Sequence, residues 1–162
     1  MPLQYVIDAY NIINHTTFPS TRRKQGPVSA LLGFIKERKL HGKLKNKVIL
    51  VFDGYPGTPL QKINEEKIEV IFSGEESADA RIKKMLDAAG NPRETVVVSD
   101  DREIKFYAKA AGAVSLGAGE FINPEQKKKD TKEDLIKAEL NYSQVSQINK
   151  ELKRLWIDKR ND

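Results

Sequence analysis

Cysteine is absent from this chain of 162 residues, and histidine occurs only twice, as His15 and His41. The absence of cysteine excludes disulfides and thiolate metal sites, and it fits a reducing compartment. Two histidines cannot make a typical structural zinc site. No apolar run is long enough to span a membrane, and the N-terminus lacks the basic and then apolar pattern of a signal peptide. We therefore expect a cytoplasmic protein without a membrane partner.

Charge, by contrast, is plentiful: 28 lysines and arginines stand against 23 aspartates and glutamates, a net charge of +5. A basic balance favours an acidic partner such as nucleic acid, although many basic proteins of this size bind none. The chain length fits one domain with a single core. We expect residues 1–123 to form this domain. Residues 124–162 are predicted to be a charged helical extension that packs on the same domain or on a partner.

Short apolar runs alternate with amphipathic segments along the first 120 residues. Between the runs, apolar residues recur at the three- and four-residue spacing of helices, as in the helix expected after Gly26. Strands that alternate with helices predict a mainly parallel sheet covered on both faces, which makes a three-layer α/β domain. Residues 11–25 and 117–119 are expected to be loops. The predicted strands are Gln4–Ile7, Val48–Phe52, Ile68–Phe72, Thr95–Val98 and Ala113–Leu116.

Acidic residues follow the first four predicted strands. Asp8 comes after the first strand and Asp53 after the second. Asp79 lies near the start of the helix after the third strand, and Asp100 and Asp101 come after the fourth. The carboxyl ends of parallel strands meet at one edge of a sheet, where such sheets place their sites. We therefore expect these carboxylates to lie close together.

Carboxylates held a few ångströms apart raise each other's pKa unless a cation is bound. Oxygen ligands without histidine or cysteine select hard cations, so we predict Mg²⁺ or Mn²⁺ as the cofactor. Asp8, Asp79 and Asp101 would hold the metal or its waters. Asp100 would position or deprotonate an attacking water. A metal in this setting lowers the pKa of bound water and neutralises charge on a phosphate.

Two further residues are expected to support this pocket. Asn11 would orient Asp8 or hydrogen-bond a phosphate oxygen, and Asp53 would act from behind the ligands. Each acid also has a purely structural interpretation. Asp53 before Gly54 is typical of a turn, and Asp100 is a suitable helix cap worth about 1 kcal/mol. For the group as a whole, the metal site is the favoured interpretation.

An acidic pocket repels a polyanion, so an RNA substrate requires basic residues around its rim. The candidates near the acids in the sequence are Arg22, Arg23, Lys24, Arg81 and Arg102. A solvated loop explains the first three equally well. For the lysines at residues 127–129, a solvated surface is the better explanation.

Four motifs, in order, make the chain resemble the NYN domain family of PIN-like nucleases, and its YacP-like bacterial branch most closely. They are VIDAYN at residues 6–11, VFDG at 51–54, SGEESAD at 73–79 and VVSDDRE at 97–103. The resemblance implies a PIN-like fold and metal-dependent RNA cleavage. It also implies that Asp8, Asp79 and Asp101 are the family's acidic positions and that Asn11 is its amide. Ala9 replaces a common glycine, and Asp100 stands where a small polar residue is common.

We accordingly expect a metal-dependent endoribonuclease that hydrolyses RNA phosphodiester bonds. The resemblance to the YacP-like branch adds messenger RNA as the substrate and the ribosome as a partner. One alternative is a non-catalytic RNA- or ribosome-binding module with the same fold, and another is a toxin-type PIN ribonuclease. A phosphatase or DNA flap nuclease on a similar sheet is a further alternative, but flap nucleases usually carry extra helices for which 162 residues leave little room.

Overall fold

The computed structural model describes residues 2–40, 42, 45–57 and 67–125. Five strands form one sheet in the order β3-β2-β1-β4-β5, and all four neighbouring pairs are parallel. The strands are rich in buried β-branched residues, as expected for a sheet covered on both faces. Their bounds are β1 Gln4–Asp8, β2 Lys47–Phe52, β3 Ile68–Phe72, β4 Thr95–Val98 and β5 Val114–Leu116.

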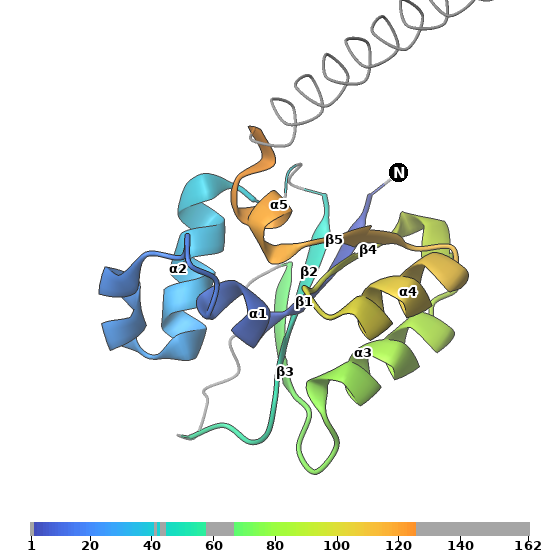
Figure 1. Ribbon diagram of the computed structural model, residues 1–162, viewed down its shortest axis with the longest axis horizontal. Coiled ribbons are helices and arrows are strands. Elements are labelled where there is room, and N and C mark those ends of the chain that lie inside the picture. The colour runs from blue at the N-terminus through green and yellow to red at the C-terminus, as the bar shows by residue number, and fades with distance from the viewer. Residues whose placement is uncertain (1, 41, 43–44, 58–66, 126–162) are drawn as a thin grey trace, which may run out of the picture. The chain divides into compact units, whose positions relative to one another are not determined.

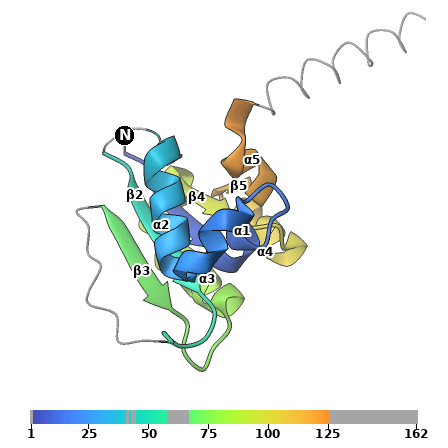
Figure 2. The same ribbon diagram turned by 90° about the vertical axis from the view of Figure 1, so that its left-hand side faces the viewer.

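Helices cover both faces of this sheet, so the predicted three-layer α/β fold is confirmed (Figure 1). Helices α1, α2 and α5 lie on one face, while α3 and α4 lie on the other. Figure 2 shows α2 lying across the sheet beside α1, with β3 at the outer edge. The bounds are α1 Ala9–Ile13, α2 Pro27–Arg38, α3 Ala78–Asp87, α4 Arg102–Ala110 and α5 Ala118–Ile122. Two short 3₁₀ helices, η1 Ser20–Gln25 and η2 Pro92–Glu94, complete the described elements.

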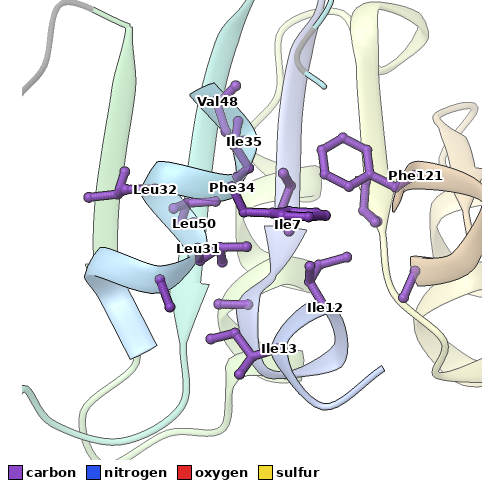
Figure 3. Close-up of a cluster of buried hydrophobic side chains, with 14 of the residues drawn as sticks. Ile7, Ile12, Ile13, Leu31, Leu32, Phe34, Ile35, Val48, Leu50 and Phe121 are labelled. Carbon is purple, nitrogen blue, oxygen red and sulfur yellow. The ribbon is translucent and has the colours of Figure 1, made fainter. Parts of the chain in front are cut away.

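Each face of the sheet has its own hydrophobic core because successive strand residues point to opposite sides. Ile7 of β1 belongs to the core beneath α1, α2 and α5, where it meets Phe34 and Leu50 (Figure 3). Its neighbour Val6 belongs to the core beneath α3 and α4, together with Ile82. Burial on both faces holds β1 firmly at the centre of the sheet.

Two segments predicted as loops are partly helical. Helices α1 and η1 lie within or just before residues 11–25, and α5 occupies the predicted flexible exit after Gly117. Helix α1 is stabilised by burial of Ile12 and Ile13, and α5 by burial of Phe121. Helices of five residues are too short to be stable alone, so tertiary packing determines them.

Residues up to Ile122 form one compact unit. The predicted helical extension at 124–162 falls almost wholly outside the described residues, so its structure, its packing and the boundary at residue 123 remain predictions. Within the described ranges, no helix is both long and apolar enough to cross a membrane.

Candidate functional site

The strand order reverses between β1 and β4, near the centre of the sheet. Connections leave β1 toward β2 on one side, and the chain returns to β4 on the other. Open α/β sheets place ligands at such a switch point, beyond the carboxyl ends of the strands. Ile7 pairs with Val98, so Asp8 and Ser99 come next to each other at this edge. Ser99 is fully buried, and its hydroxyl donates to Asp8 Oδ2 over 3.5 Å.

Asp8 is a buried carboxylate with only 5% of its surface exposed. Burial is the main cause that raises its pKa, to about 6. The hydrogen bond from Asn11 lowers this pKa, and the negative charge of Asp79 raises it. The ionised form of Asp8 is therefore costly in the protein alone, and a nearby cation would relieve that cost.

Asn11 connects the ends of β1 and β4. Its Nδ2 donates to Asp8 Oδ2 over 2.7 Å, and its Oδ1 accepts the backbone N–H of Asp100 over 2.8 Å. The turn of α1 directly after β1 returns the side chain of Asn11 to the carboxylate three residues earlier. Asn11 thus lies where the sequence predicted a supporting residue.

Asp79 occupies the first turn of α3 and is half-buried. Burial raises its pKa first, and the charge of Asp101 raises it next. Lys83 opposes this rise, whereas Glu103 and Asp53 add to it. Together with the effect of Asp79 on Asp8, these interactions connect carboxylates from the ends of β1, β2 and β4 and from the start of α3. These acids therefore interact electrostatically at the carboxyl edge of the sheet.

Asp101 is the N-cap of α4. Its Oδ1 accepts the backbone N–H groups of Glu103 and Ile104 over 2.8 and 3.0 Å. The sequence suggested Asp100 as this cap, but the cap is the next residue, Asp101. Glu103 forms an ion pair with Lys83 of α3. Among the residues described here, the Oδ2 atom of Asp101 has no hydrogen bond and remains available for another ligand.

The other two acids are tied to backbone N–H groups at helix starts. Asp100 Oδ1 accepts the N–H of Ala118 over 2.8 Å, which fixes the start of α5. Asp53 Oδ1 accepts the N–H of Ala78 over 2.9 Å and a hydroxyl bond from Ser73 over 3.3 Å. Asp53 and Asp100 are both exposed, and their hydrogen bonds stabilise the starts of helices. In each carboxylate the second oxygen takes no part in these bonds.

The donor set fits a hard divalent cation. All candidate ligands are carboxylate oxygens, and the pKa values of Asp8 and Asp79 are raised partly by other carboxylates. Within the described residues, no three acidic or histidine side chains already stand close enough together to hold an ion. Mg²⁺ commonly takes only one or two carboxylates and keeps several waters, so a complete preformed cage is not required.

The basic residues predicted for RNA differ in their surroundings. Arg22 is held on α2 by an ion pair with Glu37, and its guanidinium lies 5.9 Å from the Phe34 ring centre. Arg23 donates to the carbonyl of His15 over 3.4 Å, and both Arg23 and Lys24 are exposed. Arg22 therefore has a structural role that Arg23 and Lys24 do not share.

The remaining two arginines lie on the other face of the sheet. Arg81 on α3 forms an ion pair with Glu76 over 3.4 Å. Arg102 begins α4 directly after the cap Asp101 and is exposed. Of the two, Arg102 has its side chain more available to a phosphate backbone.

Two serines have hydrogen bonds around the acids that the sequence did not predict. Ser99 bridges Asp8 to the backbone N–H of Asp101, which it accepts over 3.1 Å. Ser73 accepts the N–H of Gly54 over 2.9 Å and donates to Asp53. Both are polar residues that directly follow a strand, as the acids do. Their position after a strand was the feature of the sequence that could have identified them. A hydroxyl carries no charge, however, so the sequence gave no reason to expect a hydrogen bond to the acids.

Residues 5–160 match the family model described as the YacP-like NYN domain. The crystal structure of Rae1 (YacP) from Bacillus subtilis is similar at 22% identity and a TM-score of 0.55, over 99% of this chain and 95% of that chain. Its W164L mutant gives 22% identity and a TM-score of 0.57, over 84% of each chain. At this identity the two structures support the fold. The comparison with curated proteins gave no match.

Proposed function

The chain belongs to the YacP-like NYN domain family, and we propose that it is a divalent-metal-dependent endoribonuclease that hydrolyses RNA phosphodiester bonds. The nuclease type of the fold supports an RNA-related function. The observation that carries the proposal is the electrostatic coupling of Asp8, Asp79 and Asp101 at the switch point of the sheet. Such a group of acids has no evident value for stability, because like charges that interact oppose folding.

Each residue of the site has its own role in the proposed reaction. Asp8, Asp79 and the unused oxygen of Asp101 would hold Mg²⁺ or Mn²⁺, which when bound supplies an acidic water and neutralises phosphate charge. Asn11 and Ser99 keep the Asp8 carboxylate in place through their hydrogen bonds. Asp100, one residue from the cap, is proposed to orient the attacking water with its second oxygen.

Basic residues around the acids would bring the RNA backbone to this edge. We propose Arg23, Lys24 and Arg102 as phosphate contacts because their side chains are exposed. Arg81 and Arg22 would contribute charge from their ion pairs. Messenger RNA on the ribosome is the proposed substrate, an inference that rests on the YacP-like branch.

A cleavage assay tests the function. Wild-type protein should cut a labelled single-stranded RNA in Mn²⁺ or Mg²⁺ and not in chelator. Asp8→Asn and Asp79→Asn should each lose at least about 100-fold in rate, as expected when a group that stabilises the transition state is removed. Circular dichroism should show that both variants remain folded.

Asp87→Asn is the matched control. Asp87 is also on α3, at its far end, where it accepts a hydrogen bond from Tyr107 over 2.6 Å. This variant should cleave like wild type. Wild-type rates in Asp8→Asn and Asp79→Asn would refute the proposal. RNA binding without cleavage by the wild-type protein would instead favour the non-catalytic binding module.

A further inference from the structure

A hollow of about 400 Å³ lies beside the acidic edge, between α1 with its following turn and the loop after β4. It shares two residues with the proposed site, Asn11 and Asp100. Its volume lies in the range of small-molecule sites, which is roughly 300–1,000 Å³. The residues that line it are Tyr10, Asn11, Asn14, His15, Thr16 and Asp100.

The lining favours the uncharged part of a nucleotide. No lysine or arginine is among the residues that line it, and the one charged group is the Asp100 carboxylate, which repels phosphate. Asn14 and Thr16 carry amide and hydroxyl groups that donate and accept hydrogen bonds. Neither side chain forms a hydrogen bond with another described residue, so both are available to a ligand.

Contacts with neighbouring residues fix the positions of two aromatic rings that line the hollow. Tyr10 packs edge-on against Phe52, with ring centres 5.6 Å apart at 89°. The His15 Nδ1 lies 2.8 Å from the hydroxyl of Thr17. On the other side, the ring lies against Gly119 of α5, where a Cβ would come within 3.2 Å of Nε2. Rings fixed in this way offer a base a stacking surface at little cost in entropy.

We infer that this hollow binds the nucleobase of a nucleotide adjacent to the scissile phosphate. Proteins read unstacked RNA bases by stacking them on aromatic or histidine rings and by hydrogen bonds to their edges. Tyr10 and His15 supply the rings, and Asn14 and Thr16 supply the hydrogen bonds. Asn11 and Asp100 connect the hollow to the acidic edge, where the phosphate would lie. The assignment to RNA rests on the proposed function.

The scarcity of histidine gives a direct measurement. The chain has only His15 and His41, so its proton NMR spectrum contains two imidazole C2–H signals, which a His41→Gln variant assigns. The full chain is titrated, in chelator, with each of the four nucleoside 5′-monophosphates and with ribose 5-phosphate. At least one nucleotide should shift the His15 signal to saturation, and ribose 5-phosphate should not.

Asn14→Ala should weaken this binding about five- to tenfold, the loss expected for one hydrogen bond. Asn91→Ala is the matched control, because Asn91 is an exposed asparagine that precedes β4, at the opposite edge of the sheet. It should bind like wild type. The inference is overturned if no nucleotide shifts the His15 signal, if ribose 5-phosphate shifts it equally, or if Asn14→Ala binds unchanged.

This test is independent of cleavage, because no metal is present. Asp79→Asn should therefore show the same His15 shift as wild type while it fails to cut RNA. A shift without any RNA cleavage by the wild-type protein would remove the proposed reaction and leave the base-binding hollow. RNA cleavage by the wild-type protein without a shift of the His15 signal would support the proposed reaction and exclude base binding in the hollow.

Discussion

The carboxylates at the edge of the sheet are of two kinds. Asp53 and Asp100 each hold a backbone N–H group at a helix start. Asp8 is buried and Asp79 is half-buried. Burial raises the pKa of both, and the charges of other acids raise these pKa values further. Asp101 combines both roles, since one oxygen caps α4 and its charge acts on Asp79. A contribution to stability does not explain why acids occur at the positions of Asp8 and Asp79.

The raised pKa of Asp8 predicts how the stability of the metal-free protein depends on pH. Burial raises this pKa from 3.8 to about 6, so protonated Asp8 favours the folded state. Its contribution is complete below about pH 4 and is lost as the pH rises through 6. Because Asp8 is almost fully buried, the loss should be on the order of 2–3 kcal/mol.

Urea unfolding between pH 4 and pH 7.5 in chelator measures this effect. Asp8→Asn cannot ionise, so the free energy of unfolding of the wild type should fall relative to that of the variant over this range. A wild-type-minus-Asp8→Asn difference that stays constant with pH would show that the Asp8 pKa is not raised.

At the scale of elements, polar side chains fix the starts of three helices around the site. Ser77 caps α3 by accepting the N–H of Ala80 over 3.1 Å. Asp101 caps α4, and Asp100 holds the first residue of α5. These bonds set where each helix begins relative to the strands, so the positions of the acids depend on them. Capping and site geometry are therefore coupled.

Asp101 allows the two roles to be separated. Asn is as good an N-cap as Asp, so Asp101→Asn should change stability by less than about 0.5 kcal/mol, whereas Asp101→Ala should cost about 1 kcal/mol. Both variants lose the negative charge and should lose RNA cleavage. Thermal unfolding together with the cleavage assay makes the comparison. Full activity in Asp101→Asn would assign Asp101 to capping alone.

The strands and their parallel arrangement were predictable because buried β-branched runs are a local signal. That arrangement places the acids that follow the strands at one edge of the sheet. The helices α1 and α5 were missed because five residues show too little periodicity, and tertiary burial of residues such as Phe121 determines them. The roles of Asp100 and Asp101 could not be told apart, since they are neighbours in sequence and the loop geometry alone directs them to different helices.

At the scale of the whole molecule, the net charge of +5 gives an attraction to RNA that does not identify the contacts. The three basic residues of η1, which precedes α2, differ in their surroundings. Arg22 of η1 packs closely against Gly33 of α2 and so stabilises the contact between the two helices. A Cβ at Gly33 would lie only 3.1 Å from Nη1 of Arg22. Arg23 and Lys24 face solvent and are the better candidates for phosphate contacts.

The double variant Arg23→Ala/Lys24→Ala should weaken binding of a labelled single-stranded RNA in chelator. Each lost phosphate contact lowers the slope of log affinity against log salt by about 0.7, so the slope should fall by about 1.4. Fluorescence anisotropy between roughly 50 and 200 mM salt measures it, in the range over which such contacts respond strongly. Lys109→Ala, at the far end of α4, is the control and should keep the wild-type slope. An unchanged slope in the double variant would exclude η1 from the interface.

The central claim is that the acids at the carboxyl edge of the sheet form a site for a divalent cation. Calorimetric titration of Mn²⁺ at pH 7.5 into wild type, Asp79→Asn and Asp87→Asn tests it most directly. We predict binding to wild type and to Asp87→Asn, and its loss in Asp79→Asn. Equal binding by Asp79→Asn would contradict the claim. So would an absence of binding by wild type both alone and with a saturating nucleoside 5′-monophosphate present.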